Sequence, residues 1–201
     1  MAKMRILDSK FDQLDGTNCF CSDESADAIR SAIGTLPVKA IHMIGTGDYH
    51  YISLFWLEKI EEDFALMLYD NHPDDQESAF GSDILSCGSW VRNARELEHV
   101  KAFSWFRGDG TYDPLPDGLP VYLSIDLDVL SKEFAHTDWS QGDVTLDALC
   151  RHISETLASH RLIGADICGG LTEQKGASPE DWALNASTEE ALIKLVSDSL
   201  T

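Results

Sequence analysis

Two short segments of the sequence carry aspartate and histidine at alternate positions. They are Asp70-Asn71-His72-Pro73-Asp74 and Ser124-Ile125-Asp126-Leu127-Asp128. Each follows an apolar stretch that is typical of a buried strand, 64–69 and 121–123. Carboxylates and imidazoles delivered from the carboxyl ends of two strands can converge on one or two divalent cations. The two segments therefore predict a metal site.

The surroundings of the second segment support this prediction. Asp126 and Asp128 directly continue an apolar strand, where like charges without a counter-cation would suffer severe desolvation. A pair of divalent cations removes that conflict. The alternative for 70–74 is an ordinary acidic turn, since Asp, Asn and Pro are common in loops. An α/β protein whose acidic segments bind no metal is the corresponding alternative for the whole chain.

A third contribution follows the apolar segment 38–44. The turn Gly45-Thr46-Gly47-Asp48-Tyr49-His50 brings a histidine to the start of the next expected helix. A histidine at a helix start is commonly a capping or surface residue. This turn, however, is expected at the same sheet edge as the two acidic segments. His50 is therefore a candidate ligand.

Apolar runs that we expect to be strands alternate with amphipathic segments that we expect to be helices. The strands are expected at 4–7, 38–44, 64–69, 100–106, 121–125 and 162–168, and the helices at 22–36, 51–62, 89–98, 145–159 and 187–200. This alternation implies right-handed βαβ units. The predicted fold class is α/β, a three-layer α/β/α arrangement with a mostly parallel sheet. In such sheets, ligands bind beyond the carboxyl ends of the strands, where the acidic segments lie.

Composition and charge narrow the possible partners. The 201 residues indicate one domain, 1–201, and the net charge of −20 disfavours binding to nucleic acid or to anionic membranes. The first residues contain no apolar core of signal-peptide length, and a cytoplasmic location is expected. Five cysteines, an odd number, favour reduced thiols over a disulfide framework. A zinc knuckle at the isolated pair Cys19 and Cys21 is a minor alternative.

These motifs resemble those of the arginase/agmatinase (ureohydrolase) family. The family signatures D-A-H-x-D and S-x-D-x-D are matched by 70–74 and 124–128, in the family's order and after strands. The first signature, G-G-D-H-S, is degraded here to Gly47-Asp48-Tyr49-His50, which separates Asp from His by one residue. The resemblance runs over about 38–170. Because the chain is shorter than typical members, we expect it to lack some substrate-binding loops.

The resemblance implies an arginase-like fold and two manganese ions. Six residues would hold these ions: Asp70 and Asp126 as bridges, His50 and Asp74 at one ion, and His72 and Asp128 at the other. Such a pair of ions can hold a hydroxide and direct it at a planar carbon. Asp74 would accept a hydrogen bond from that hydroxide and orient it. The oxygen-rich ligand set itself suits Mn²⁺, with zinc and iron as alternatives.

Departures from the family pattern concern the substrate. Cys87 stands where the family has its proton-shuttle histidine, and it is either a proton carrier or an inert buried thiol. Gly169 stands where the family has the glutamate that grips a guanidinium, and Glu173 is a candidate substitute. In the loop 134–143, Trp139 could wall off a substrate and His136 could serve as an acid or base. A surface tryptophan and a solvated histidine are the alternative interpretation of this loop.

The sequence thus predicts a dinuclear manganese hydrolase for a small molecule. The expected reaction is hydrolysis of a carbon–nitrogen bond, in a linear amide, an amidine or a guanidine-type substrate. The alternative is a catalytically inactive metal-binding protein of the same fold, with a regulatory or scaffolding role. A homo-oligomer is plausible by resemblance.

Overall fold

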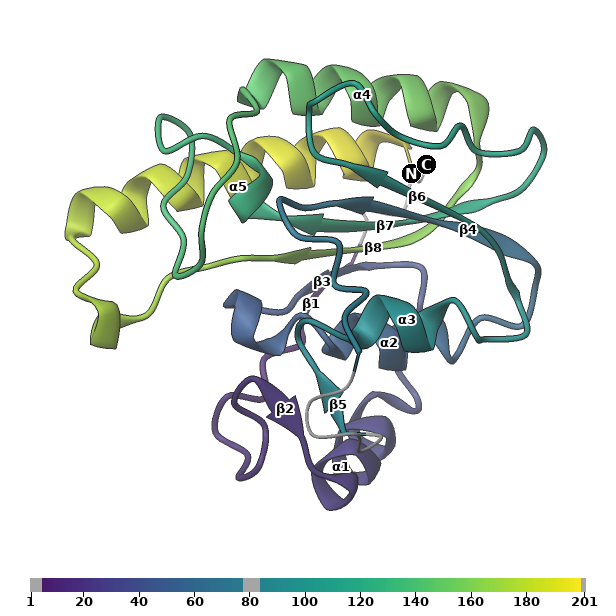
Figure 1. The fold of residues 1–201 in the computed structure, drawn as a ribbon, viewed down its shortest axis with the longest axis horizontal. Coiled ribbons are helices and arrows are strands. Elements are labelled where there is room, and N and C mark those ends of the chain that lie inside the picture. Colours follow the sequence, from purple (N-terminus) through teal and green to yellow (C-terminus); the bar gives the residue numbers. More distant parts are fainter. Residues whose placement is uncertain (1–4, 78–83, 200–201) are drawn as a thin grey trace.

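A parallel six-stranded sheet forms the centre of the computed structural model, which describes residues 5–77 and 84–199 (Figure 1). The strand order is β1-β3-β8-β7-β4-β6, and every pairing between neighbours is parallel. The strands are β1 (Ile6–Asp8), β3 (Ile41–Met43), β4 (Phe64–Tyr69), β6 (Val100–Phe106), β7 (Val121–Asp126) and β8 (Leu162–Cys168). The carboxyl ends of β4 and β7 are therefore adjacent.

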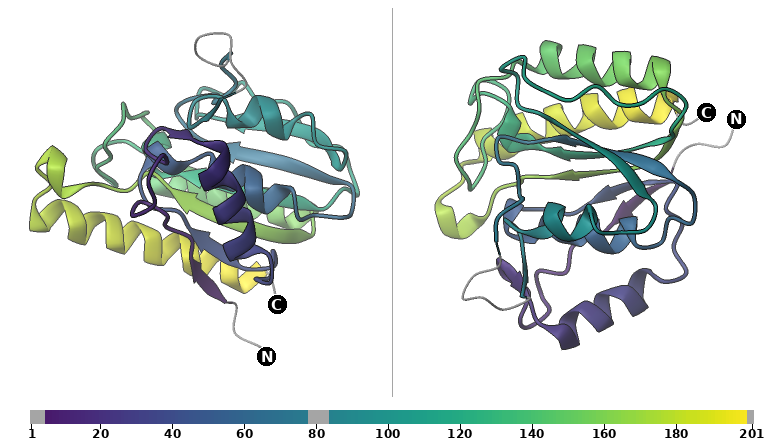
Figure 2. Two further views of the ribbon diagram at one scale, coloured as in Figure 1. Left: turned by 90° about the horizontal axis from the view of Figure 1, so that it is seen from below. Right: turned by 45° about the vertical axis from the view of Figure 1, so that its right-hand side comes forward.

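Helices cover both faces of this sheet, as Figures 1 and 2 show. One face carries α4 (Leu146–Ser159) and α5 (Pro179–Ser199), and the other carries α1 (Asp23–Ile33), α2 (Ile52–Leu57) and α3 (Trp90–Ala94). Leu66 and Leu68 of β4 pack into the core beneath α1–α3, whereas Met67 and Tyr69 pack into the core beneath α4 and α5. This alternation explains why β4 is apolar at every position. The predicted three-layer α/β class is confirmed.

The closing helix differs from its prediction. It begins at Pro179 and not at 187. Ser178 precedes it: the Ser178 hydroxyl oxygen accepts from the Asp181 N–H at 3.1 Å, and the Ser178 N–H donates to the Asp181 carboxylate at 2.8 Å. This reciprocal cap, with proline in the first turn, starts a helix two turns earlier than the cluster at 187 suggests.

Other boundaries also moved. α2 and α3 are shorter than the expected 51–62 and 89–98, and β1 lies slightly later than 4–7. Position 4 and position 200 of the expected elements lie outside the described residues. Within 5–77 and 84–199, no helix has both the length and the apolar character needed to cross a membrane.

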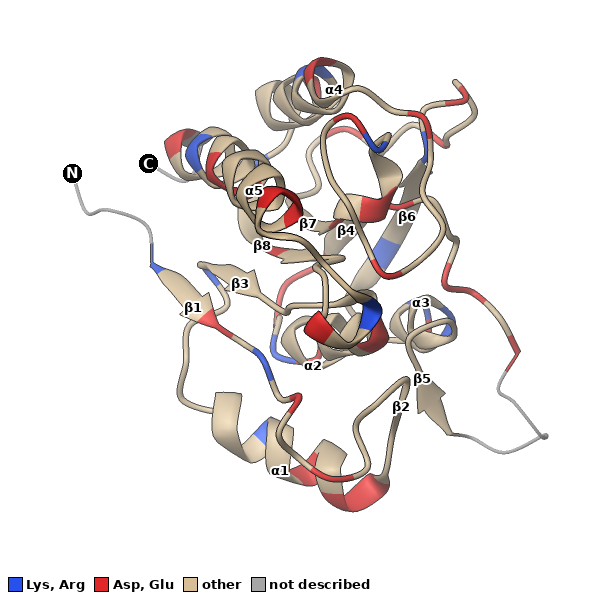
Figure 3. Ribbon diagram, turned by 90° about the vertical axis from the view of Figure 1, so that its left-hand side faces the viewer, with Lys and Arg blue, Asp and Glu red and all other residues tan. Residues whose placement is uncertain are grey.

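A second, small sheet was not predicted. β2 (Phe20–Cys21) pairs antiparallel with β5 (Leu85–Ser86), beside α1 and α3 (Figure 1). Each strand has two residues, too few for a periodic pattern in the sequence. In Figure 3, acidic residues are spread over helices and loops on both faces of the main sheet. The negative charge is therefore general and not confined to one patch.

Candidate metal centre

Three loops at the carboxyl edge of the main sheet carry the six predicted ligands. His50 caps the short 3-10 helix η1 (Gly47–Tyr49) after β3. Asp70, His72 and Asp74 lie on the loop after β4. Asp126 ends β7, and Asp128 lies in the following 3-10 helix η3 (Leu127–Val129). The adjacent ends of β4 and β7 bring the two acidic loops together.

His50 lies within reach of three carboxylates. Its Nδ1 is 3.1 Å from an oxygen of Asp74, 3.2 Å from Oδ2 of Asp70 and 3.4 Å from Oδ2 of Asp126. All four side chains are buried. Nitrogen and oxygen atoms at this spacing can share a single cation, and the carboxylates would otherwise repel one another without solvent.

His72 forms a second group with Asp128 and the same Asp70. The Nδ1 of His72 is 2.8 Å from Oδ2 of Asp128 and 3.5 Å from Oδ1 of Asp70. Asp70 thus presents Oδ2 to His50 and Oδ1 to His72, which is the arrangement of a bridging carboxylate. His50, Asp70 and Asp74 form one potential metal-binding group, and Asp70, His72 and Asp128 form another.

Hydrogen bonds behind His50 set which ring nitrogen faces the carboxylates. The Ser124 hydroxyl donates to Asp166 at 2.7 Å, and the Nε2 of His50 lies 2.9 Å from the Ser124 oxygen. Because the only hydroxyl proton is directed to Asp166, the Nε2 of His50 must donate to Ser124. In a neutral ring, Nδ1 then offers a lone pair toward Asp70, Asp74 and Asp126. A metal ligand needs this tautomer.

The titration behaviour of the buried groups also fits a cation site. Burial raises the pKa of Asp126 well above its usual value, and the charges of Asp128 and Asp70 raise it further. Burial likewise raises the pKa of Asp128 to about 6, against hydrogen bonds that lower it. Hydrogen bonds with Asp128 and Asp70 raise the pKa of His72 to about 10. Bound protons thus neutralise part of the negative charge of this cluster, and divalent cations would take their place.

Asp74 is held by a residue that the sequence does not reveal. The indole Nε1 of buried Trp90 donates to Oδ2 of Asp74 at 2.8 Å, and the Val91 N–H donates to the Asp74 carbonyl at 3.0 Å. Asp74 has a positive φ of 45°, a conformation that these contacts maintain. Trp90 occupies an apolar helix position, so its sequence pattern indicates only core packing. Trp90 is a positioning residue for Asp74.

The position of Gly169 explains one departure from the family pattern. Its φ is +88°, and an added Cβ would lie 2.0 Å from Oδ1 of Asp126 and 2.7 Å from the Leu127 nitrogen. Only glycine fits this backbone without displacing Asp126. The chain directly after β8 therefore lies close to Asp126, at the position where the family resemblance implies a glutamate.

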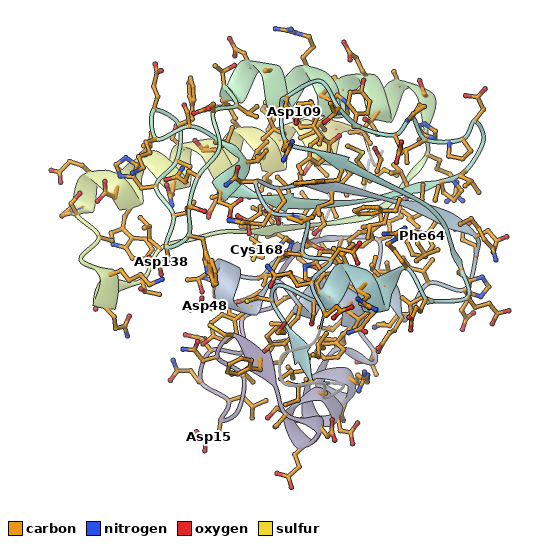
Figure 4. All side chains as sticks on the ribbon, viewed as in Figure 1. Asp15, Asp48, Phe64, Asp109, Asp138 and Cys168 are labelled. Carbon is orange, nitrogen blue, oxygen red and sulfur yellow. The ribbon has the colours of Figure 1, made fainter. Side chains whose placement is uncertain are left out.

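A cavity of about 260 Å³ opens above the six residues. Cys87 and Trp139, two of the predicted site residues, both line it. Burial raises the pKa of Cys87 to about 12, so this thiol is protonated at neutral pH. The Trp139 indole donates to Asp48 at 2.8 Å. Asp48 and Asp138 lie at the end of the main sheet opposite to Phe64, the first residue of β4 (Figure 4).

Two predicted site residues lie elsewhere. His136 contacts Asp181 of α5 through Nδ1, and its backbone exchanges hydrogen bonds of 2.8 and 2.7 Å with Asn185. Glu173, in the 3-10 helix η4 (Glu173–Lys175), lines a different groove with Trp182. Among the described residues, neither of the two lines the cavity above the ligands. The structure gives no basis for an acid–base role of His136 or a substrate contact by Glu173, because α5 and its connection hold both away.

Comparison of the sequence with known proteins does not assign a family. No family model matches the chain. An uncharacterized protein of Thermotoga maritima is 33% identical over 144 residues, which are 64% of this chain and 57% of the relative. This chain therefore spans little more than half of that relative.

Solved structures of similar fold cover most of the chain. They include proclavaminate amidino hydrolase from Streptomyces clavuligerus, with a TM-score of 0.66, 16% identity and coverage of 90% of this chain and 72% of that one. Arginase from Medicago truncatula has a TM-score of 0.63 and 15% identity, and the match covers 89% of this chain and 66% of that one. Formimidoylglutamase from Bacillus subtilis has a TM-score of 0.61 and 14% identity, and the match covers 89% of this chain and 68% of that one. The chain therefore has the fold of the arginases, agmatinases and formimidoylglutamases.

Proposed function

We propose that this protein is a metal-dependent hydrolase of the arginase/agmatinase family that cleaves a carbon–nitrogen bond in a small molecule. The observation that carries the proposal is the pair of ligand groups that share Asp70 at the floor of one cavity. Buried carboxylates in this number require positive charge nearby. The fold of the ureohydrolase structures supports the same function.

Two divalent ions, for which we propose Mn²⁺, fit these residues. Asp70 and Asp126 would bridge the ions, His50 and Asp74 would complete one site, and His72 and Asp128 would complete the other. Four carboxylates and two imidazoles form a mostly hard, oxygen-rich donor set, which suits Mn²⁺ better than copper. When bound, such a pair of ions activates water at neutral pH and stabilises negative charge that develops on the substrate.

The chain's own residues would prepare this chemistry. Ser124 and Asp166 keep the proton of His50 on Nε2, so that Nδ1 is free to bind a cation. Trp90 holds the carboxylate of Asp74, which lines the cavity and would accept a proton from the attacking water. Burial keeps the Cys87 thiol protonated, so that it does not compete as a base.

We infer a linear amide or an amidine as the substrate class, in preference to arginine. Gly169 leaves no carboxylate at the guanidinium-binding position, and Asp126 occupies the space that a side chain there would need. Phe20, Cys87 and Trp139 form part of the cavity lining and offer apolar surface to a substrate. The name of one similar structure, a formimidoylglutamase, agrees with an amidine.

The test is turnover of the Mn²⁺-loaded full chain on a panel of amidines, linear amides, ureas and guanidines. We expect Asp74→Asn to lower kcat by roughly 100-fold or more, as for loss of a general base. Asp75→Asn is the matched control, because Asp75 pairs with Arg95 away from the cavity and this variant should retain activity.

Failure of the whole panel, with two ions bound, would replace this proposal with the second candidate. That candidate is an inactive metal-binding protein with a regulatory or scaffolding role. Cys87 in place of a shuttle histidine, together with Gly169, is the observation that favours it. Turnover that survives Asp74→Asn unchanged would contradict the assignment of Asp74.

A further inference from the structure

The small sheet places two cysteines opposite each other. Phe20 pairs with Ser86 and Cys21 pairs with Leu85, so the same register sets Cys19 opposite Cys87. The Cys87 N–H donates to the Cys19 carbonyl at 2.9 Å, which confirms that the pairing extends to these residues. The two cysteines therefore lie side by side although 68 positions separate them in the sequence.

This placement suits a disulfide. Directly opposed residues of an antiparallel pair have Cα atoms about 4.5–5.5 Å apart. A disulfide spans Cα separations of about 4.4–6.8 Å. The side chains also meet: burial and Asp48 raise the pKa of Cys19, while a hydrogen bond with the Cys87 side chain lowers it. The Cys19 thiol also donates to the Asn18 side-chain oxygen at 3.1 Å, so a bond between the two sulfur atoms needs rotation of the Cys19 side chain away from Asn18.

Both thiols border the cavity above the candidate metal ligands. Cys19 and Cys87 are partly exposed, and both line that cavity. Cys168 and Cys21, by contrast, are buried, and Cys150 lies on α4 across the main sheet. A small oxidant that enters the cavity therefore meets this pair of thiols together.

We propose that Cys19 and Cys87 are a redox modification site, which a peroxide converts into a reversible disulfide in the cavity wall. Cys19, the less buried thiol, loses its proton and attacks one peroxide oxygen. The O–O bond breaks, an alcohol or water leaves, and Cys19 becomes a sulfenic acid. Cys87 attacks that sulfur, the S–O bond breaks, and the Cys87 proton passes to the departing oxygen, which leaves as water. Two thiols lose two electrons and two protons, and the peroxide takes up both.

The site has a direct connection to Asp74. Gly88, next to Cys87, accepts a hydrogen bond of 2.9 Å from the Gln76 N–H, and Trp90 two residues later holds the Asp74 carboxylate. A bond to Cys19 would tie this segment to the loop before β2. Oxidation would therefore alter the cavity wall beside Asp74 without removing any candidate ligand.

The experiment treats the reduced full chain with a small excess of hydrogen peroxide, then unfolds it in denaturant and blocks all free thiols with iodoacetamide. We expect three alkylated cysteines in place of five, and a non-reducing peptide map that joins the peptides of Cys19 and Cys87. Dithiothreitol should restore five alkylated cysteines. Cys19→Ser and Cys87→Ser should each prevent the cross-link, whereas Cys150→Ser, the matched control, should retain it.

Three outcomes would overturn the proposal. They are alkylation of all five cysteines after peroxide, a cross-link between any other pair, and irreversible oxidation of Cys19 or Cys87 to a sulfinic acid. The peptide map of the wild-type chain decides among these even where a variant does not fold. The measurement needs neither metal nor substrate, so its result is separate from that of the activity panel.

Discussion

The floor and the rim of the cavity are built in different ways. We define the floor as His50, Asp70, His72, Asp74, Asp126 and Asp128, and the rim as Cys19, Phe20, Cys87 and Trp139. The floor stands on the ends of β3, β4 and β7, whose positions the main sheet dictates. The rim comes from the two-residue strands β2 and β5, from their flanks, and from a loop after β7. The main sheet thus fixes the positions of the candidate ligands, whereas the rim comes from short segments whose positions the main sheet does not fix.

The largest expected effect comes from Gly169, whose backbone lies close to Asp126 beneath the floor, and it is a loss of stability. In Gly169→Ala, the backbone strain of about 1–2 kcal/mol adds to overpacking against Asp126 of about 1–3 kcal/mol. We expect the free energy of unfolding to fall by about 2–5 kcal/mol and metal binding to weaken. Urea unfolding and metal analysis of the folded fraction measure both.

Gly118→Ala is the matched control for that change. Gly118 has a φ of +83°, but no atom lies within 4 Å of its added Cβ. It should lose only the strain, about 1–2 kcal/mol. Equal losses in the two variants would show that Gly169 makes no special approach to Asp126.

The hydrogen-bonded support of the floor gives the next effect. Ser124→Ala leaves the Nε2 of His50 and Oδ1 of Asp166 without their shared partner. We expect Mn²⁺ affinity to fall by about 10–100-fold in a competition titration with a chelator. Ser104→Ala, at a buried serine of β6 that bonds to the Asp113 carbonyl, should leave the affinity unchanged. Equal Mn²⁺ affinities in the two variants would show that Ser124 does not support metal binding through His50.

The pH dependence of metal binding tests the charge balance of the floor. In the metal-free protein, hydrogen bonds with Asp128 and Asp70 raise the pKa of His72 to about 10, so the ring holds a proton at neutral pH. The pKa of His50 is also raised, because its hydrogen bonds with Asp70 and Asp74 outweigh the effect of burial. A metal ion requires neutral rings, so Mn²⁺ affinity should rise at least about tenfold per pH unit between about pH 6 and 8. A flat profile over this range would contradict ligation by His72.

The stability of the metal-free protein should change with pH in the opposite direction to the Mn²⁺ affinity. Because the folded-state pKa of His72 is raised, its contribution to metal-free stability is complete below about 6.5 and is lost as the pH rises through about 10. The difference in Tm between the Mn²⁺-loaded and metal-free proteins should therefore widen as the pH increases. Thermal melts at matched ionic strength measure this difference.

The rim gives the smallest effect. Cys87→Ala should change Mn²⁺ affinity and kcat by less than about threefold, because a thiol with a pKa of about 12 does not transfer protons at neutral pH. A proton carrier would instead lose roughly 100-fold in kcat. A loss of that size, at unchanged metal content, would restore Cys87 as the counterpart of the shuttle histidine.

The floor could be predicted because its information is local. Each acidic segment directly follows its strand, and parallel strands bring their carboxyl ends to one edge. The α/β layers follow from apolar runs that alternate with amphipathic ones. The position of His50 was harder to predict, because its loop must cross from β3 past β8 to reach β7. The sequence shows only that a glycine-containing turn precedes this histidine.

The remaining contacts depend on pairs of residues that are distant in the chain. The early start of α5 at Pro179 creates Asp181 as a partner for His136, so a boundary error at one helix misplaces a candidate acid 45 residues away. The Trp90 contact with Asp74 likewise joins a core position to a ligand loop. Local periodicity contains no information on such pairs.

Metal stoichiometry tests the central claim most directly. After loading with Mn²⁺ and removal of free ions, elemental analysis of the wild-type chain should give two ions per chain. Asp126→Ala, which removes a proposed bridge, should retain fewer than one, and Asp75→Asn should retain two. A wild-type chain that holds no Mn²⁺ after loading, or an Asp126→Ala variant that still holds two ions, would contradict the dinuclear site.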